Sequence, residues 1–292
     1  MEVGVTGPSL SKAENITFKS ITEYFGRGLS IALLDDMMKV MNPVSAVVIA
    51  KNEAKIIKQV IENLSFCQEV IVVDNASVDE TAKIAEKSGA KVQTMAGVDF
   101  SLLRNTGLTA ARGPWVLFVD ADETVSVELK NEIIQIVNNP EIKSVGFQIK
   151  RRNYFLGHEM KYGEIGCDWV LRLARKTAGS WERGVHETWA VKGGVGKLKN
   201  SLRHNTAENL TDFLDKTIFW AKLHAQANLA EGKKATFWKV LVYPKAKFIG
   251  AYIIKAGWRD GVYGLVYAMI MAFHSFLSWG DAWVLQRKSA KA

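Results

Sequence analysis

Short segments that read as strands alternate with segments of helical spacing through the first part of the chain. The expected strands cover residues 44–50, 70–73, 91–94 and 115–119. Between them, apolar residues recur at helical spacing over residues 53–64, 77–88 and 102–111. This alternation predicts an α/β fold with a mostly parallel sheet and helices on both of its faces.

Local signals mark the ends of the second helix. The run Ser77-Val78-Asp79-Glu80 is a capping box, which predicts a helix start, and Gly89 is placed as the stop of the same helix. A further helix over 126–138 and a strand over 144–150 are expected next. The pattern then becomes irregular over 151–200, and we expect this region to bind the acceptor of a transfer reaction.

The last part of the chain is aromatic and apolar, and residues 261–279 contain no Asp, Glu, Lys or Arg. These 19 residues approach the length that spans a membrane. Glycines within the stretch, and tryptophans and tyrosines around it, favour helices that lie in or on a membrane surface. A spanning segment and a buried core helix are the alternatives. An anionic leaflet would suit the surrounding cations, which are Lys239, Lys245, Lys247, Lys255 and Arg259.

These patterns divide the chain into three expected parts. Residues 1–41 are an N-terminal extension that we expect to be poorly ordered, residues 42–205 form the α/β domain, and residues 206–292 form a helical, membrane-associated tail. The N-terminus lacks the basic and apolar regions of a secretory signal peptide. A cytoplasmic location, peripheral at the inner face of the cell membrane, is therefore expected.

The 292 residues carry a formal net charge of +8, which predicts an anionic partner. Nucleic acid, an anionic lipid surface and a phosphorylated substrate all fit that charge. No zinc-finger or RNA-binding signature is present, so we expect no nucleic-acid partner. The two cysteines, Cys67 and Cys167, lie far apart and indicate neither a disulfide framework nor a zinc site.

Three carboxylates follow the strand at 115–119 almost without a break: Asp120, Asp122 and Glu123, with only Ala121 between them. Carboxylates this close repel one another unless a cation or water is present. Hard cations such as Mg²⁺ combine one or two carboxylates with water and phosphate. The sequence therefore predicts a metal-bound diphosphate at this strand end. Alternatively, Asp122 and Glu123 complement the dipole of the next helix.

Four motifs, in order, resemble the family 2 glycosyltransferases. They are VIAKNE at 48–53, VVDNASVDET at 72–81, RNTG at 104–107 and FVDADE at 118–123. Within that family, GVHE at 184–187 and GWRDGVYGL at 257–265 resemble small bacterial enzymes that add glucose or a similar sugar to the lipopolysaccharide inner core. The chain departs from the pattern at its N-terminal extension and at Leu103, where the resemblance leads us to expect a polar residue.

The resemblance implies a GT-A fold, a UDP-sugar donor and a divalent cation, Mg²⁺ or Mn²⁺. It implies that the nucleotide-sugar contacts are Lys51, Asn52, Glu53, Asp74, Arg104 and Asp120. Asp74 is expected at the uridine and Arg104 at a phosphate. Asp122 is expected to bind the metal directly, with Asp120 nearer the ribose or bound through water. Simpler roles are a turn or cap for Asp74 and Asn52, and a solvated helix position for Arg104.

Transfer to a sugar hydroxyl needs a carboxylate base. Glu187 is our candidate, with Glu182 and Asp168 in reserve, and the alternative for Glu187 is a salt bridge to Arg183 or Lys192.

Histidine is the other residue type that could complete a divalent site. His186 and His204 are both possible ligands, and we assign only His204 to the metal. His158, His224 and His274 receive no role.

Together these features predict an inverting, metal-dependent glycosyltransferase. It would move a hexose, with glucose expected, from a UDP-sugar to a lipid-linked saccharide such as the lipopolysaccharide inner core. The alternatives are a polyprenyl-phosphate glycosyltransferase, which differs in its acceptor, and a non-catalytic basic protein that binds membranes.

Overall fold

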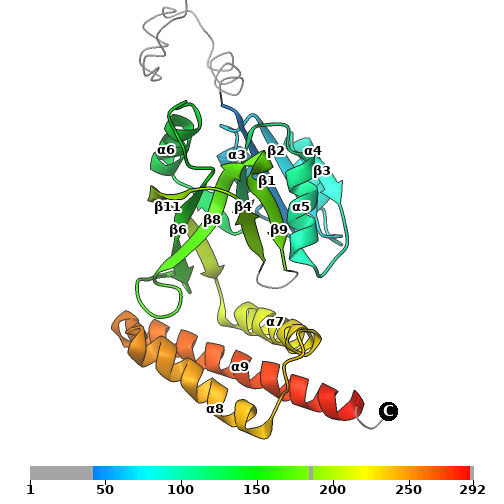
Figure 1. Cartoon of the computed structure of the whole chain (residues 1–292), viewed down its shortest axis with the longest axis vertical. Helices are drawn as coiled ribbons and strands as arrows, with labels where there is room; N and C mark the ends of the chain where they lie inside the picture. Colours follow the sequence, from blue (N-terminus) through cyan, green and yellow to red (C-terminus); the bar gives the residue numbers. More distant parts are fainter. Residues whose placement is uncertain (1–41, 184–186, 290–292) are drawn as a thin grey trace, which may run out of the picture.

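The computed structural model describes residues 42–183 and 187–289. A sheet with flanking helices forms one half of the molecule, and a layer of long helices lies beneath it (Figure 1). The expected extension over 1–41 lies outside the described residues.

The first four strands form a parallel sheet, as the sequence predicts. They are β1 (Val44–Ala50), β2 (Glu69–Asp74), β3 (Lys91–Thr94) and β4 (Trp115–Asp120). In the sheet, β1 lies between β2 and β4, and β3 forms the edge beside β2. The connecting helices are α3 (Ile57–Asn63), α4 (Thr81–Lys87) and α5 (Phe100–Ala110).

The other half of the sheet is mixed, and its strand directions were not predicted. Its strands are β5 (Glu123–Val125), β6 (Gly146–Phe155), β7 (His158–Met160), β8 (Asp168–Arg175) and β11 (Val195–Ala207). The order is β3-β2-β1-β4-β8-β6-β11-β5, with β7 beside β6. Strand β8 is antiparallel to both β4 and β6, so it is a reversed strand between them, and β6 and β11 run in the direction of β4. Three further elements are α6 (Val127–Val137), the 3₁₀ turn η1 (Lys176–Ala178) and the hairpin of β9 (Gly179–Glu182) with β10 (Thr188–Val191).

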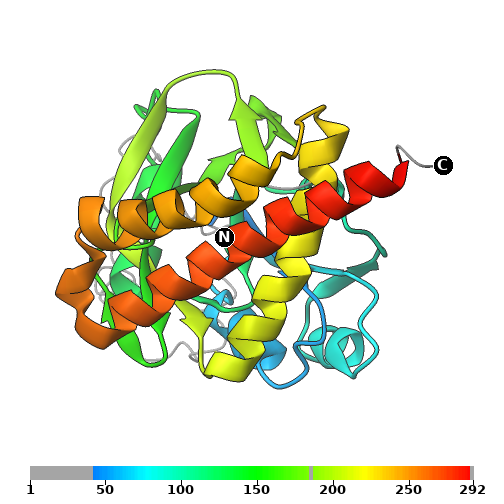
Figure 2. The ribbon, with the colours of Figure 1, turned by 90° about the horizontal axis from the view of Figure 1, so that it is seen from below.

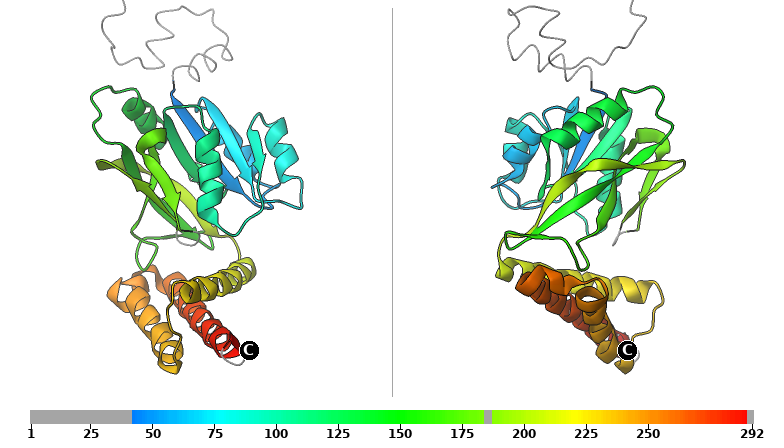
Figure 3. Two further views of the ribbon diagram at one scale, coloured as in Figure 1. Left: turned by 45° about the vertical axis from the view of Figure 1, so that its right-hand side comes forward. Right: turned by 90° about the vertical axis from the view of Figure 1, so that its left-hand side faces the viewer.

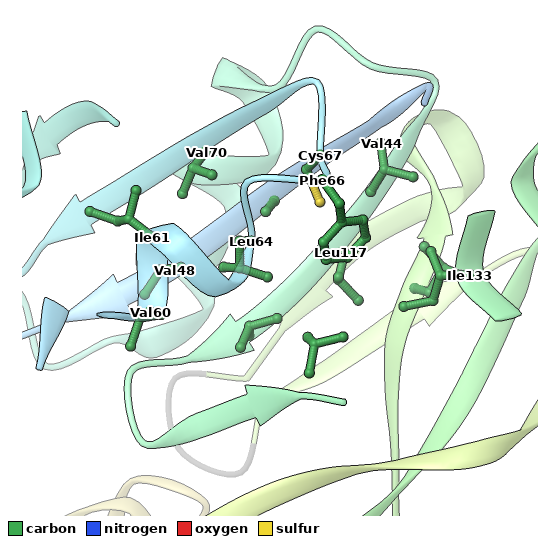
Figure 4. Close-up of a cluster of buried hydrophobic side chains, with 14 of the residues drawn as sticks. Val44, Val48, Val60, Ile61, Leu64, Phe66, Cys67, Val70, Leu117 and Ile133 are labelled. Atoms are coloured by element: carbon green, nitrogen blue, oxygen red, sulfur yellow. The ribbon is translucent and has the colours of Figure 1, made fainter. Parts of the chain in front are cut away.

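Helices cover both faces of the parallel strands because successive residues of a strand point to opposite faces. On one face, Val48 and Leu117 pack with residues of α3 and α6 (Figure 4). On the other face, Val47 and Phe118 pack with α5 and the β9–β10 hairpin. The Phe118 ring stands edge-on to Trp181 and Trp189, with ring centroids 5.0 Å from each. The hairpin is thereby fixed against α5.

The capping box at Ser77 was predicted wrongly. Helix α4 begins at Thr81, and the Ser77 hydroxyl instead accepts a hydrogen bond from the Asn52 amide at 2.9 Å. Asp79 accepts from the Thr81 amide at 3.0 Å. The predicted helix start is four residues too early, because Ser77 hydrogen-bonds to the loop after β1 and does not cap the helix. Gly89 does end the helix region, with φ of +88°, a conformation that favours glycine.

The helical layer contains α7 (Leu210–Ala230), α8 (Phe237–Phe248), the π-helical turn η2 (Ile249–Ile254), the 3₁₀ turn η3 (Gly257–Asp260) and α9 (Gly261–Ser289). Helix α9 packs against both α7 and α8. Seen from below, α7 crosses the other two helices, and it lies between them and the sheet (Figures 2 and 3). Helix α7 lies within the part of the chain that the sequence predicts to be helical, and Asn209 caps it by accepting from the Asp212 amide.

Two contacts join the layer to the sheet. Phe155, at the end of β6, packs its ring against Phe213 of α7 and Tyr267 of α9, at centroid distances of 5.1 and 5.4 Å. Asp260 accepts hydrogen bonds from the backbone amides of Lys161 and Tyr162, just after β7. The apolar contact and the polar contact together fix the helices below the strand ends.

By length and composition, the stretch Gly257–Lys288 could cross a membrane, and it is the one such helix within the described ranges. Of the 18 most apolar consecutive residues in this stretch, only 28% are buried. This exposure favours the surface and spanning interpretations over a buried core helix.

Candidate active site

The carboxyl ends of β1, β2 and β4 bring the predicted aspartates to one edge of the sheet. Asp74 pairs in register with Ala50, and Asp120 pairs with Ile49. The two aspartates therefore lie on either side of β1, about 10 Å apart, since neighbouring strands are separated by about 4.8 Å. In open α/β sheets this edge is where ligands bind.

Asp74 combines the turn role and a free acceptor. It is buried, and its Oδ2 accepts from the Ser77 amide at 3.1 Å. This contact is the turn role that the sequence analysis gave as the simpler alternative for Asp74. Its Oδ1 is also buried but has no partner among the described residues. A buried carboxylate oxygen without a partner costs free energy, so it marks a position for a donor N–H or O–H from a ligand.

The loop after β1 is tied to the loop after β2. Asn52, with φ of +57°, accepts from the Val78 amide at 2.9 Å and does not cap α3. The Glu53 amide donates to the Thr81 hydroxyl at 2.8 Å. Glu53 also lines a cavity beside this loop. Burial raises the pKa of Glu53, and Lys216 partly opposes that shift. Lys51 is exposed at the start of this loop.

The three clustered carboxylates point to different places. Asp120 accepts from Arg104 Nη2 at 3.0 Å through Oδ1, and from Arg172 Nη2 through Oδ2. Glu123 is fully buried and accepts from the Asp120 amide at 2.9 Å and from Arg172 at 3.2 Å. Its other ion pair is with Arg151, at 3.5 Å. Glu123 therefore serves this arginine cluster and does not complement the dipole of α6.

The arginines determine the charge of Asp120. Burial alone raises the pKa of this carboxyl group, but the charges of Arg104, Arg172 and Arg151 outweigh the effect and hold its pKa far below the usual range. Both oxygens of Asp120 already accept hydrogen bonds from guanidinium groups, which makes Asp120 less suited than Asp122 to bind a metal directly. The assignment of the direct ligand to Asp122 stays a prediction.

Arg172 was missed in the sequence. It lies at a bulge of β8, where the pairing with β6 skips from Leu173 to Leu171, and it is 4% exposed. Because a bulge interrupts the alternation of faces along a strand, the sequence pattern carried no signal that this arginine is buried beside acidic partners. Two donors of the cluster, Nη1 of Arg104 and Nε of Arg172, are buried without a partner among the described residues.

Asp122 and His204 form the candidate metal pair. Their nearest atoms, Asp122 Oδ2 and His204 Nε2, are 3.4 Å apart. His204 Nδ1 lies 2.6 Å from Asn153 Oδ1, and Asn153 Nδ2 donates to the Ile165 carbonyl at 2.7 Å. Because that contact identifies Oδ1 as the acceptor, neutral His204 carries its proton on Nδ1 and presents the Nε2 lone pair toward Asp122.

Asp122 and His204 fit a divalent cation whose remaining ligands come from the substrate and water. No group of three acidic, histidine or cysteine side chains poised for a metal occurs among residues 42–183 and 187–289. Mg²⁺ and Mn²⁺ sites that bind nucleotides use few protein ligands and take the rest from phosphates and water. Burial lowers the pKa of His204, but the protonated ring can donate to Asp122, and this interaction raises the pKa overall. A bound cation would take the place of that proton on Nε2.

A cavity of about 560 Å³ opens beside this pair. It is lined by Asn52 and Glu53 from the β1 loop, by Asp122 and by Lys216 from α7. Lys216 is exposed and makes no ion pair within 4 Å among the described residues. The helical layer thus supplies one wall of the cavity, and it adds a cation that the sequence interpretation did not assign.

Glu187 lies beside Arg104, which links it to the carboxylate cluster. Arg104 Nε donates to Glu187 Oε1 at 3.0 Å, while its Nη2 binds Asp120. Arg104 is 5% exposed, and its guanidinium carbon is 4.7 Å from the centre of the Trp181 ring. Arg104 is therefore not a solvated helix residue. The salt bridge proposed for Glu187 has Arg104 as its partner, whereas Arg183 pairs with Glu231 at 3.4 Å.

The reserve bases are less suitable. Asp168 is held by Arg151 at 2.6 Å, and Glu182 is exposed at the end of β9. His186 lies outside the described residues.

Comparisons with known proteins find similarity to glycosyltransferases. Residues 45–189 match the family described as Glycosyl transferase family 2. The chain is 28% identical over 258 residues to a lipopolysaccharide core biosynthesis glycosyltransferase, LpsC, of Rhizobium meliloti, with 86% of this chain and 94% of that protein covered. An uncharacterized glycosyltransferase of Rickettsia felis is 27% identical, with 81% and 88% covered. Among solved structures, mannosyl-3-phosphoglycerate synthase from Rubrobacter xylanophilus gives a TM-score of 0.46 at 16% identity, with 70% and 80% covered.

Proposed function

Because this chain is a glycosyltransferase whose residues 45–189 form a family 2 domain, we propose that it moves a hexose from a UDP-sugar to a lipid-linked saccharide. Glucose is the proposed hexose, and the lipopolysaccharide inner core is the proposed acceptor. The name of the relative LpsC supports this acceptor, since the alignment covers 94% of that protein and extends through the helical layer. The family also sets aside the non-catalytic alternative.

One observation carries the proposal. Asp74 with its unpaired Oδ1, and the Asp122–His204 pair, occupy the same edge of the sheet. The base or ribose of a nucleotide can donate to Asp74, and the phosphates then extend across β1 toward Asp122. Lys216 and the free Nη1 of Arg104 are the cationic donors proposed for the diphosphate.

Asp122 and His204 would hold the divalent cation, with remaining positions left for phosphate oxygens and water. The cation, when bound, would neutralise charge that accumulates on the UDP leaving group. Asn153 keeps the His204 ring in the orientation that presents Nε2. Asp120 holds Arg104 and Arg172 in place at the same edge.

Glu187 is the proposed base. Its Oε1 accepts from Arg104 Nε, and its Oε2 accepts no hydrogen bond from the described residues. Oε2 is therefore available for the proton of the acceptor hydroxyl. As that oxygen bonds to the anomeric carbon, the bond from this carbon to UDP breaks on the opposite side, and the configuration inverts.

The proposed location is the inner face of the cell membrane. Exposed apolar side chains of the helical layer include Trp238, Ile254, Trp258 and Val262, and cations such as Lys239 and Lys255 lie between them in the sequence. Such a surface suits an anionic leaflet. It serves a polyprenyl-phosphate acceptor equally well, which keeps that acceptor as the second candidate.

The test is UDP release from a panel of UDP-hexoses, with Mg²⁺, Mn²⁺ or EDTA, and with lipopolysaccharide core, polyprenyl phosphate or no acceptor. We expect release from one UDP-sugar only when both metal and lipopolysaccharide core are present. Glu187→Gln and Asp122→Asn should each lower kcat by about 100-fold or more, because they remove the base and a metal ligand.

Glu182→Gln is the matched control, since Glu182 is an exposed carboxylate near the same loop, and it should retain turnover. Full turnover in EDTA would remove the metal from the proposal. Full turnover by Glu187→Gln would remove the base, and transfer to polyprenyl phosphate alone would change the acceptor.

A further inference from the structure

A second cavity, of about 250 Å³, lies at the other end of α7 from the donor cavity. It is enclosed by all three long helices and by Arg183 at the end of β9. Its lining is mainly polar and cationic: Arg183, His224, Asn228, Glu231, Lys233, Lys247, His274, Ser275, Ser278 and Trp279, with Ala227. Nothing in the donor chemistry uses these side chains.

The lining has more cations than anions. Arg183 and Lys233 both pair with Glu231, at 3.4 and 2.7 Å. Lys247 pairs with Glu164, which lies outside the lining. With Glu164 counted, these three cationic side chains are matched by two carboxylates, which leaves one positive charge in excess, so the local field favours an anion.

Polar and aromatic groups complete the cavity. His224 Nδ1 and His274 Nε2 are 3.0 Å apart, so the two rings share a hydrogen bond across α7 and α9. Asn228 and Ser275 add donors and acceptors, and Trp279 adds an aromatic ring. Hydroxyl groups of a sugar match such polar groups, and its C–H surface matches an indole ring. The lining therefore suits a charged saccharide better than a purely apolar ligand.

The cavity is connected to the loop that carries the proposed base. Arg183 has φ of +69°, an unfavourable backbone conformation for a non-glycine residue. From that position its side chain reaches Glu231, at the end of α7. Glu187 follows four residues later in the sequence. Arg183 is therefore the residue of the lining that is nearest in sequence to the proposed base.

We infer that this cavity binds an anionic group of the acceptor, a phosphate or carboxylate carried on a sugar. The inference rests on the proposed function, because it assigns the second substrate of that reaction. It predicts an acceptor whose charged group lies at a distance from the hydroxyl to be glycosylated, because the donor nucleotide and the acceptor anion occupy opposite ends of α7.

Binding of small probes tests the inference without any transfer reaction. Calorimetric titrations of the full chain would use glucose 6-phosphate, glucuronate, neutral glucose and inorganic phosphate. We expect at least one of the two anionic sugars to bind about tenfold more tightly than both glucose and inorganic phosphate. Comparison of the first two probes distinguishes a phosphate from a carboxylate.

The variant Arg183→Gln/Lys233→Gln should weaken binding of the anionic sugar about tenfold. Lys222→Gln/Lys234→Gln is the matched control, because it removes the same charge from residues outside the lining, and it should bind as wild type does. Lys233→Gln alone, at an exposed position, provides a second variant if the double change impairs folding.

Equal binding of the anionic sugar by wild type and the Arg183/Lys233 variant would overturn the inference. Equal binding of glucose and both anionic sugars would do the same. A parallel titration with UDP and Mg²⁺ reports on the proposed donor site separately. If wild type does not bind UDP, that result counts against the proposed function. The sugar titrations still test the second cavity in that case.

Discussion

At the scale of single residues, Arg104 and Arg172 decide what the acidic motif is able to bind. They occupy both oxygens of Asp120, and Arg172 also binds Glu123. Only Asp122 is left with an accessible carboxylate, beside His204. Of the three acids in the motif, Asp122 is therefore the proposed metal ligand, because the other two acids pair with buried cations that need partners.

Lys216 is the residue that we expect to connect the helical layer to donor binding. It lines the cavity of Asp122 and acts electrostatically on Glu53. Lys216→Gln should raise the Kd for UDP about tenfold, because a charged contact to phosphate is lost. Titration calorimetry with UDP and Mg²⁺ measures this change. Lys222→Gln, six residues further along α7 and outside that cavity, is the control, and equal Kd values for both variants would contradict the role.

Glu69 lies far from the site, and its ionisation leads us to expect that the fold loses stability in acid. Burial alone raises its pKa, but hydrogen bonds from Lys91, Ser45 and the Arg112 amide outweigh burial and lower the pKa from 4.5 to about 2. A carboxylate with a lowered pKa stabilises the fold above its unfolded value, and that contribution is lost as pH falls from about 4.5 to about 2. The loss amounts to about 3 kcal/mol at most.

Urea unfolding between pH 2 and 6 checks this dependence. In Glu69→Gln the free energy of unfolding should be lower at pH 6 and should fall less steeply below pH 4.5. Parallel curves for the variant and wild type would show that Glu69 does not titrate differently in the folded chain.

At the scale of elements, the joint between η3 and the β7 loop fixes the helical layer. The Asp260 carboxylate is buried and accepts from the amides of Lys161 and Tyr162 at 2.9 to 3.2 Å. This explains physically why an aspartate stands in the GWRDG segment that was first noted only as a family resemblance. Gly257 and Gly264 allow the close packing, because a Cβ on Gly264 would lie 1.9 Å from the Gly257 carbonyl oxygen.

Asp260→Ala should loosen this joint selectively. It leaves two backbone amides without acceptors, at a cost of about 1–3 kcal/mol each. Hydrogen exchange should speed up in the β7 loop and in η3, whereas the amides of β1 and β2 should keep their protection. Asp281→Ala in α9 is the control, because the Asp281 carboxylate makes no hydrogen bond or ion pair with the described residues. Uniform acceleration through the whole chain would indicate global destabilisation instead.

At the scale of the whole molecule, α7 lies between the strand ends and the exposed helices α8 and α9 (Figure 1). The two cavities lie toward opposite ends of α7, one beside Asp122 and one beside Arg183. If α8 and α9 rest on a membrane, the site stands about one helix diameter or more above it, which is about 10 Å. A saccharide that projects from its lipid would reach that height.

Vesicle binding tests the membrane surface. Trp238 and Ile254 are 70% and 77% exposed, and burial of each in a bilayer surface contributes about 2 kcal/mol. Trp238→Ser/Ile254→Ser should therefore reduce sedimentation with anionic phosphatidylglycerol vesicles by more than about tenfold. Val98→Ser/Val127→Ser changes two exposed residues of the sheet half and should have no effect. Equal binding by both variants would place membrane contact elsewhere.

The sequence alone determined the parallel half of the fold and the identity of the acidic edge. Strands β1 to β4 and helix α7 follow from local periodicity, and Asp74, Asp120 and Asp122 follow from strand ends that parallel topology brings together. Only the tertiary structure decided the directions of β8 and β11, the pairings of Arg104 and Arg172, and the position of Lys216 at the donor cavity. These depend on contacts between residues far apart in sequence, and local pattern carries no information about which distant charges meet.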